Sequence, residues 1–310
     1  MIDVGYYESL KQKPIKSVKR YRFTWFDVLN YVGLVLLAFV CIFPVLYEIL
    51  LSVSSRADYL KTVGEGGNIL VFPYHFNFEN YKFIFGQGRV PKAFAISLFI
   101  TIVGTLYSMV LTAFGAYAFT KKKVPFLKVF FFLIIFQMFF SGGTIPFFLH
   151  VQKTLTLNNL WCLIIPFGIN SFNLIILRNF FSQVPDDLIE NARLEGLNEF
   201  QILFKIVIPL SKPGLATILL WYVISYWDAW YWASFFLPKA TDLYPLALEL
   251  RNILQKMDGS NPSSGADGSY LFAQGTNAAT IVISILPILV FYPFLQKYFV
   301  KGYMKGSVKG

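Results

Sequence analysis

The chain has 310 residues, of which 56% are hydrophobic, 19% are aromatic and only 14% are charged. Soluble globular domains carry about 25% charged residues, so this composition excludes that class and indicates a membrane protein. We therefore interpret the formal net charge of +10 as a signal for orientation in the membrane and for attraction to anionic lipids. It does not indicate nucleic-acid binding.

Six apolar stretches are long enough to cross a bilayer, because about 20 helical residues span its hydrocarbon core. The third stretch is interrupted at Ser141-Gly142-Gly143 and again at Pro146, where protein or water must satisfy the freed backbone groups. The predicted fold class is an all-α integral membrane protein with six transmembrane helices. In chain order the predicted spans are 28–51, 93–118, 126–149, 160–181, 214–236 and 277–296.

Lysine and arginine near span ends favour the cytoplasmic side. With both termini inside, most of the 27 basic residues lie in inner segments. This orientation predicts a multi-pass protein of the cell membrane, with a permease domain at 28–298 between a basic cytoplasmic tail (1–27) and a second cytoplasmic tail (299–310). The loop 182–212 then faces the cytoplasm. Two longer loops face outside, at 52–92 and 239–276.

The two outer loops differ in composition. The first carries the aromatic run 72–81, which favours the membrane interface. The second contains the turn-rich stretch 258–265 and, before it, a short helix that begins at or near Pro245. Loops of this size suit an external partner, and they also suit spacers; composition does not separate the two.

The inner loop 182–212 predicts a short helix followed by a second one. Pro185 can open the first helix, and Asp186, Asp187 and Glu190 place negative charge near the positive end of its dipole. Gly196 stands where this helix should stop.

A second short helix follows, with Asn198 as its cap and Pro209 as its end. Ala192 and Gly196 are four residues apart, so a shared helix face would leave a shallow place where a partner can approach closely.

The same loop resembles the EAA loop of binding-protein-dependent ABC importers, which reads Glu-Ala-Ala, two variable residues, Asp-Gly-Ala, a Phe and an Ile-x-Leu-Pro-x-x-x-Pro tail. The matching positions are Glu190, Ala192, Gly196, Phe204, Ile206, Pro209 and Pro213, while Asn191, Glu195 and Leu197 depart from the pattern. In that family the loop is the coupling helix that docks into the ATP-hydrolysing subunit. The alternative is an ordinary amphipathic cytoplasmic loop. The resemblance implies an ATPase-coupling role for Asp187, Glu190, Asn191, Ala192, Glu195, Gly196 and Leu197.

Further stretches at 140–146, 173–181, 244–246 and 298–310 are similar to carbohydrate-importer permeases of the MalG type, in particular to their LplC/YtcP-like branch in Gram-positive bacteria. The resemblance implies a type I ABC importer permease (MetI-like) fold. It also implies three partners: a second, MalF-like permease, a homodimeric or heterodimeric ABC ATPase and an extracellular solute-binding protein. The chain would then form half of the path for a carbohydrate, with an oligosaccharide expected.

Several site types are missing from the sequence. No Gly-Lys-Ser or Gly-Lys-Thr occurs, so no P-loop is present, and ATP and Mg are expected in the partner ATPase. No His, Cys and Asp cluster has metal-ligand spacing. We therefore expect no cofactor or metal in this chain, no enzyme activity of its own and no nucleic-acid partner.

Polar residues inside predicted spans are candidates for a substrate path, because they are costly unless they face protein or water. Asp228 lies in the fifth span among tryptophans, and aromatic faces combined with carboxylates or amides suit sugars. Equally, Asp228 could pack against the partner permease, and Asn170 and Asn173 could bond across helices. The candidate path residues are Asp228, Trp227, Trp230, Tyr231, Asn170 and Asn173.

The rival interpretation is an ion-coupled secondary transporter of a small polar solute. Such a protein needs intramembrane carboxylates for coupling and usually shows repeated halves. This chain offers one convincing carboxylate, Asp228, and no clear repeat. A membrane-bound enzyme is a more distant alternative.

Overall fold

The computed structural model describes residues 24–65, 76–86, 88–121, 124–140, 142–259 and 273–306. Within these ranges every regular element is a helix, which confirms the all-α class for the described part of the chain. The chain divides into two compact units, residues 1–47 and 48–310.

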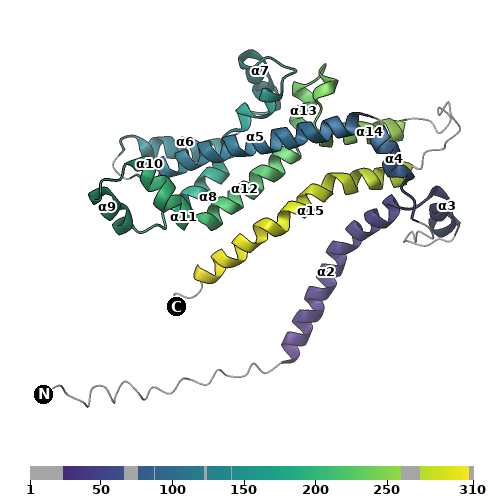
Figure 1. Ribbon diagram of the computed structural model, residues 1–310, viewed down its shortest axis with the longest axis horizontal. Helices are drawn as coiled ribbons and strands as arrows, with labels where there is room; N and C mark the ends of the chain where they lie inside the picture. Colours follow the sequence, from purple (N-terminus) through teal and green to yellow (C-terminus); the bar gives the residue numbers. More distant parts are fainter. Residues whose placement is uncertain are drawn as a thin grey trace. The chain divides into compact units, whose positions relative to one another are not determined.

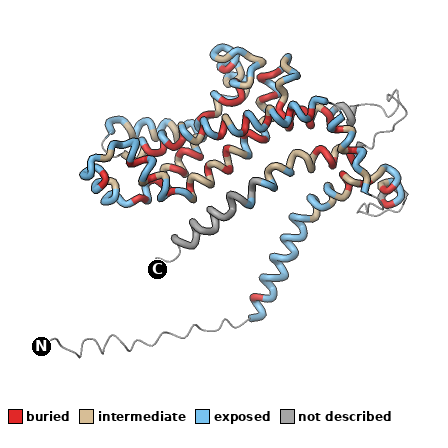
Figure 2. The backbone as a smooth tube through the Cα atoms, in the orientation of Figure 1, coloured by how far each residue is buried: buried red, intermediate tan, exposed pale blue. Residues whose placement is uncertain are grey.

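Helix α2 (Trp25–Ser52) provides the described part of the first unit. Its start is capped locally, because Asp27 accepts hydrogen bonds from Thr24 N–H (2.7 Å) and from the Thr24 hydroxyl (2.6 Å). Figure 2 shows that nearly the whole helix is exposed, and Trp25 and Phe26 are among its exposed apolar side chains. An apolar helix of this length needs lipid or protein around it, as expected for the first predicted span.

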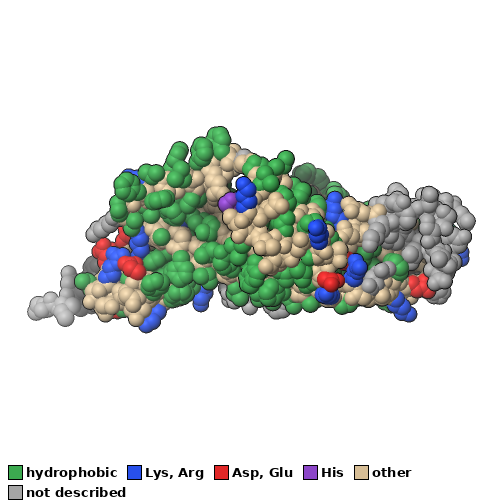
Figure 3. Space-filling view, turned by 90° about the horizontal axis from the view of Figure 1, so that it is seen from above, with side chains coloured by type: hydrophobic (Ala, Val, Ile, Leu, Met, Phe, Trp, Pro, Cys, Tyr) green, Lys and Arg blue, Asp and Glu red, His purple; other side chains and the backbone are tan. Residues whose placement is uncertain are grey.

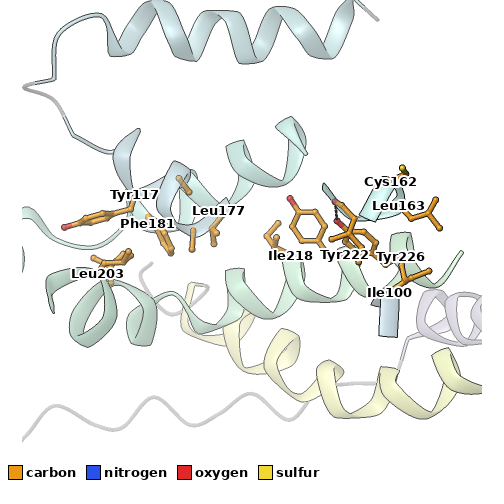
Figure 4. Packing of buried hydrophobic residues seen from close by; sticks show 14 of the residues in the cluster. Ile100, Tyr117, Cys162, Leu163, Leu177, Phe181, Leu203, Ile218, Tyr222 and Tyr226 are labelled. Carbon is orange, nitrogen blue, oxygen red and sulfur yellow. Dashed lines mark hydrogen bonds between the residues drawn. The ribbon is translucent and has the colours of Figure 1, made fainter. Parts of the chain in front are cut away.

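The second unit is built around helices α5 (Arg89–Ala118) and α12 (Lys212–Trp227), which lie side by side (Figure 1). Helix α8 (Ser171–Phe181) packs against both, and α15 (Ala273–Gly306) packs along α12. Figure 4 shows the buried cluster of this unit, which extends from Tyr117, Phe181 and Leu203 at one end to Ile100, Leu163 and Tyr226 at the other.

Helix α5 buries a face of small and hydroxyl-bearing residues, and such residues let membrane helices approach closely. At Gly104 the approach leaves no room for a side chain, since an added Cβ would lie 2.6 Å from Cε1 of Tyr226. The Tyr226 ring is itself fixed, because its hydroxyl bonds to Ser108 Oγ at 2.8 Å. The buried small and polar residues of α5 are Ser97, Thr101, Gly104, Thr105, Ser108, Thr112, Ala113 and Ala116.

The third predicted span is two helices, α6 (Leu127–Phe139) and α7 (Thr144–Thr154). The predicted break at 141–143 is confirmed: α6 ends before it, and Gly143 has φ +85° immediately before α7. Pro146 does not interrupt the chain again. It lies in the first turn of α7, where the missing N–H removes no helix hydrogen bond.

The fourth predicted span is also bent. Two 3-10 turns, η2 (Leu160–Leu163) and η3 (Ile165–Phe167), precede α8, and the two parts meet at 46°. Gly168 allows this bend to lie against α5, because an added Cβ there would be 2.5 Å from Cε1 of Tyr107.

The fifth predicted span, 214–236, was expected to be continuous, and this expectation is wrong. Helix α12 ends at Trp227, Asp228 caps it with φ −93° and ψ 39°, and α13 (Trp230–Phe236) follows. The ψ value leaves the helical region, so the backbone changes direction at Asp228.

The sixth predicted span extends further than 277–296, because α15 continues to Gly306 and so takes in most of the predicted tail 299–310. Among the segments predicted to lie outside, the first loop contains α3 (Arg56–Tyr59), η1 (Leu60–Glu65) and α4 (Glu79–Gly86). The second loop contains η5 (Thr241–Leu243) and α14 (Leu246–Gly259), which confirms the helix expected at Pro245. The aromatic run 72–81 and the turn-rich stretch 258–265 lie partly outside the described residues.

Within the described residues, α2 and α5 are each long and apolar enough to cross a membrane, and two bent pairs raise the number to four. The bent pairs are the fourth span and the combination of residues 199–210 with α12. The six predicted spans are therefore not all single long apolar helices among the described residues.

The contact at Gly104 predicts a stability effect. Gly104→Ala should destabilise the protein by about 1–3 kcal/mol, because the new methyl group overlaps the fixed Tyr226 ring. This exceeds the ~0.5–1 kcal/mol that alanine gains over glycine inside a helix. The midpoint of thermal unfolding in detergent should fall accordingly. Gly86→Ala is the matched control, since an added Cβ there meets nothing within 4 Å; equal midpoints for the two variants would contradict the packing argument.

Candidate functional site

The EAA-like loop, residues 182–212, begins with helix α9 (Asp186–Leu194), preceded by Pro185 as predicted. The helix also ends where it was expected to end. Gly196 has φ +83°, its N–H donates to Arg193 O (3.0 Å), and Leu197 N–H donates to Ala192 O (3.0 Å). This is the left-handed glycine termination, which satisfies the carbonyls that a helix end leaves unpaired.

The second helix is capped by Asn198, as predicted. Its side chain accepts from Gln201 N–H (2.9 Å), and Gln201 Oε1 accepts from Asn198 N–H (3.0 Å), which makes a capping box. Helices α10 (Glu199–Ile202), η4 (Leu203–Val207) and α11 (Ile208–Leu210) then follow without a gap. Pro209 therefore lies inside α11, and the turn toward α12, of 87°, comes after Leu210.

The side chains of this loop divide into a buried and an exposed set. Ala192 is buried in the core, whereas Gly196 lies beyond the helix end in open space. The shared small-residue face predicted for these two positions is therefore wrong. Leu197 is half-buried against the core. The remaining predicted coupling residues, Asp187, Glu190, Asn191 and Glu195, are exposed.

Sequence reasoning missed the exposed apolar residues of the same loop. Leu194 is 86% exposed, and Leu188, Phe200 and Phe204 are also exposed. Exposed apolar side chains need protein or lipid around them, and the Phe200 and Phe204 rings also contact the Phe114 ring of α5, with centroids 5.9 and 6.1 Å away. In the sequence, Leu194 stands between the charged residues Arg193 and Glu195. This apolar residue among charged neighbours was the signal that could have indicated its exposure.

Glu199 joins this loop to the end of α5. Its carboxylate accepts hydrogen bonds from the Tyr117 hydroxyl (2.6 Å), Lys121 Nζ (2.6 Å), and Arg193 Nη2 (2.9 Å) and Nε (3.1 Å). Figure 3 shows charged side chains gathered at the end of the molecule where Figure 1 places α9 and α10.

The surroundings of Glu199 keep it ionised. Burial alone would raise its pKa, but hydrogen bonds from Lys121 and Tyr117 outweigh that effect. With the help of the Lys121 charge and the Arg193 guanidinium they lower the pKa from 4.5 to about 2. A lowered pKa means that the contacts are fully present above about pH 4.5 and are lost as the pH falls through 2.

A cavity of about 800 Å³ lies between α6, α7, η3, α8, α12 and α13. Its size falls within the range of about 300–1,000 Å³ that is usual for small-molecule sites. The described residues of its wall are mostly aromatic, amide, hydroxyl and glycine residues, with Ile169 and Pro166, and none of them is charged. Aromatic and polar members of the wall include Gln137, Phe147, Asn170, Asn173, Trp221, Tyr222, Tyr226 and Trp232.

Of the six predicted path residues, Asn170 and Asn173 line this cavity. They are also joined to each other, because Asn170 Oδ1 caps α8 by accepting from Asn173 N–H (3.1 Å). Asp228 is exposed at the break after α12 and is not part of the cavity wall.

The three predicted aromatic residues beside Asp228 also lie outside the cavity wall. Trp227 is buried and donates from Nε1 to Ser284 O (3.0 Å). The Arg251 guanidinium lies over the Trp230 ring, 3.8 Å from the centroid of that ring. Tyr231 contacts Trp232, which does line the cavity, with ring centroids 5.2 Å apart.

Two tyrosines of α12 shape the cavity and hold the bend beside it. Tyr222 OH accepts from Asn170 N–H (3.1 Å) and shares a hydrogen bond with Thr112 Oγ1 (2.7 Å). Tyr226 OH donates to Ile164 O (3.3 Å) and bonds to Ser108 (2.8 Å). Figure 4 shows both rings on α12 below the 3-10 segment. The pair thus satisfies backbone groups that the broken fourth span frees, as a membrane interior requires.

A second cavity, of about 1180 Å³, borders α9, the ends of α5 and α8, and the start of α6. Its wall mixes apolar residues with charges of both signs, including Lys128, Arg178 and Glu190. Among the described residues, no group of three or more His, Cys, Asp or Glu side chains could hold a metal ion.

Comparison with known families resolves the identity of the chain. The model of the family described as "Binding-protein-dependent transport system inner membrane component" matches residues 117–305, which contain both the EAA-like loop and the cavity wall. The chain belongs to this family. Its members are membrane components of transport systems and are not themselves catalytic.

Relatives and a solved structure agree with this family. The polygalacturonan/rhamnogalacturonan transport system permease protein YtcP of Bacillus subtilis is 37% identical over 287 residues, covering 92% of this chain and 98% of the relative. Protein LplC of the same organism is also 37% identical over 287 residues, covering 92% and 95%. The B. subtilis arabinooligosaccharides permease protein AraQ is 26% identical over 307 residues, covering 97% and 100%.

A chain in the crystal structure of a bacterial ABC transporter involved in the import of the acidic polysaccharide alginate has a TM-score of 0.80 and 32% identity. The likeness covers 90% of this chain and 100% of that chain.

The tyrosine contacts predict a second stability effect. Tyr222→Phe should destabilise the protein by about 1–3 kcal/mol, because it leaves the fully buried Thr112 hydroxyl without its partner. Tyr107→Phe is the control, since the Tyr107 hydroxyl makes no hydrogen bond to any described residue. Thermal unfolding of both variants in detergent checks this, and a Tyr222→Phe midpoint equal to the control would contradict it.

Proposed function

We propose that the chain is the permease subunit of an ATP-driven, binding-protein-dependent importer of a carbohydrate, with an oligosaccharide as the expected substrate. The observation that carries the substrate class is the uncharged cavity wall, which contains both aromatic rings and amides. Rings stack on the C–H faces of sugars and amides bond their hydroxyls. The relatives named for polygalacturonan/rhamnogalacturonan and for arabinooligosaccharides support the same class.

The proposed assembly contains a second, MalF-like permease, an ABC ATPase dimer that binds ATP and Mg, and an extracellular solute-binding protein. The membership in a binding-protein-dependent family supports this set of partners. This chain would bind no cofactor itself. We infer six membrane crossings with both termini in the cytoplasm, because most basic residues then lie inside. The exposed apolar surface of α2 is suited to contact with lipid or the second permease.

In the proposed mechanism the EAA-like loop docks on the ATPase. The exposed residues Asp187, Glu190, Asn191, Glu195 and Gly196 would contact it directly, with Leu194 as an apolar anchor. Ala192 and Leu197 would hold the loop to the permease core. When ATP binding closes the ATPase dimer, α9 moves with it and the helices rock between inward-open and outward-open states.

The substrate path is proposed along the cavity. Asn173 and Asn170 would bond sugar hydroxyls, and Trp221 and Trp232 would stack on the rings. Tyr231 would hold the Trp232 ring in place through the contact between their rings. Asp228, Trp227 and Trp230 lie off this wall, so we assign them a supporting role at the break between α12 and α13.

The coupling role predicts the effect of two loop variants. Glu190→Lys reverses an exposed charge on α9, and Gly196→Asp adds bulk to a glycine at φ +83°. Both should reduce uptake at least about tenfold, because a lost interface contact costs about 1.4 kcal/mol or more. The assay is uptake of labelled galacturonan and arabinan oligosaccharides by cells expressing each variant. Membrane content of the chain should stay unchanged. Normal uptake by both variants would refute the coupling role, and uptake abolished by an uncoupler at constant ATP would favour the ion-coupled alternative.

The path predicts a contrast between two polar residues. Asn173→Leu should lower uptake per assembled complex about tenfold, since it removes a hydrogen-bonding group from the cavity wall. Asp228→Leu should leave uptake per complex within about twofold, a change of less than 0.5 kcal/mol. The reverse result would place the path at Asp228. Severe loss of uptake per complex in both Asp228→Asn and Asp228→Leu would indicate a proton-linked carboxylate instead.

A further inference from the structure

Helix α9 is weakly held by packing. The structure describes every residue of this helix, and Ala192 is the only one of them that is buried. One of its sides borders the cavity of about 1180 Å³, so little apolar material fixes it laterally. A movement of α9 therefore needs some other connection to reach the transmembrane helices.

Glu199 supplies such a connection. It stands directly after the turn that ends α9, and its carboxylate bonds back to Arg193 on α9 (2.9 Å) and across to Tyr117 and Lys121 (2.6 Å each). Tyr117 lies in the last turn of α5, and Lys121 follows that helix. The three donors thus join two separate elements through one carboxylate.

Helix α5 leads from this point to the cavity. Thr112 lies five positions before Tyr117 on α5 and bonds to Tyr222, and Ser108 one turn further bonds to Tyr226. Both tyrosines line the cavity. Continuous hydrogen bonds and one rigid helix therefore connect the EAA-like loop with the proposed substrate path.

We propose that Glu199 is a positioning residue that transmits movement of the EAA-like loop to α5 and so to the cavity wall. The proposal rests on the coupling role proposed above for that loop. It assigns Glu199 no contact with sugar, ATP or the ATPase. On the transmembrane side, Tyr117 and Lys121 would receive this movement from Glu199.

The Arg193 side of this cluster adds little to stability. The Glu199 side chain is 50% exposed and that of Arg193 is 47% exposed, so solvent screens this ion pair. On the other side Lys121 is 21% exposed and Tyr117 is buried. A structural role would show as a change in assembly, whereas a transmitting role shows as uncoupled ATP hydrolysis.

The test compares Glu199→Gln, Tyr117→Phe and the double variant in proteoliposomes containing the whole complex and its binding protein. Each is assayed for assembled complex, ATP hydrolysis and sugar taken up per ATP, with galacturonan and arabinan oligosaccharides as probes. Lys153→Gln, which removes an exposed charge from the last turn of α7, outside the EAA-like loop and both cavity walls, is the control.

We expect Glu199→Gln to keep ATP hydrolysis within about twofold while sugar per ATP falls about fivefold or more, the size of a typical coupling free energy. Tyr117→Phe should lower the same ratio, and the double variant should be no worse than Glu199→Gln, because both remove one connection. Lys153→Gln should match the wild type.

The proposal would be overturned if Glu199→Gln keeps the wild-type amount of sugar per ATP. It would also be overturned if the losses of sugar per ATP add in the double variant. If Glu199→Gln fails to assemble, Tyr117→Phe decides alone, since it keeps every charge. If Glu190→Lys loses uptake while the Glu199 and Tyr117 variants keep the wild-type amount of sugar per ATP, only the transmission is refuted. Normal uptake in Glu190→Lys and Gly196→Asp as well would refute the coupling role itself.

Discussion

The close approach of α5 to α12 is the constraint on which the second unit depends. It requires glycine at 104, because the Tyr226 ring occupies the space of a side chain there. The approach brings Ser108 and Thr112 within hydrogen-bond distance of Tyr226 and Tyr222. Those tyrosines in turn reach the backbone of the bent fourth span, so the helix pair, the bend and the cavity wall form one connected arrangement.

The two candidate regions share α5 as a common element. At one end of the helix Tyr117 belongs to the Glu199 cluster beside the EAA-like loop, and further along Thr112 and Ser108 hold the cavity tyrosines. A transporter must link an event at one membrane surface to a change in its interior. A single helix with hydrogen bonds at both places is suited to that link, because it joins the two regions directly.

The sequence predicted features that local chemistry determines. Proline, glycine and asparagine set the ends of α9 and α10 through contacts within a few residues, so Pro185, Gly196 and Asn198 could be assigned correctly. The break at Asp228 could not, because no glycine or proline marks it. Tyr222 and Tyr226 were missed because their partners lie 110 and 118 positions away. Trp227 looked like a sugar-binding ring, yet its partner on α15 is also distant in sequence, which makes it a packing residue.

The uncharged cavity wall has a consequence for what can pass along it. On the proposed path, a uronate moving past this wall would meet no fixed charge of either sign among the described residues, so this subunit would give it neither a deep electrostatic trap nor a repulsive barrier. Discrimination between acidic and neutral glycans must then come from elsewhere in the assembly. One permease of this kind could serve systems of different specificity, with the facing subunit and the delivery protein setting the preference for charge.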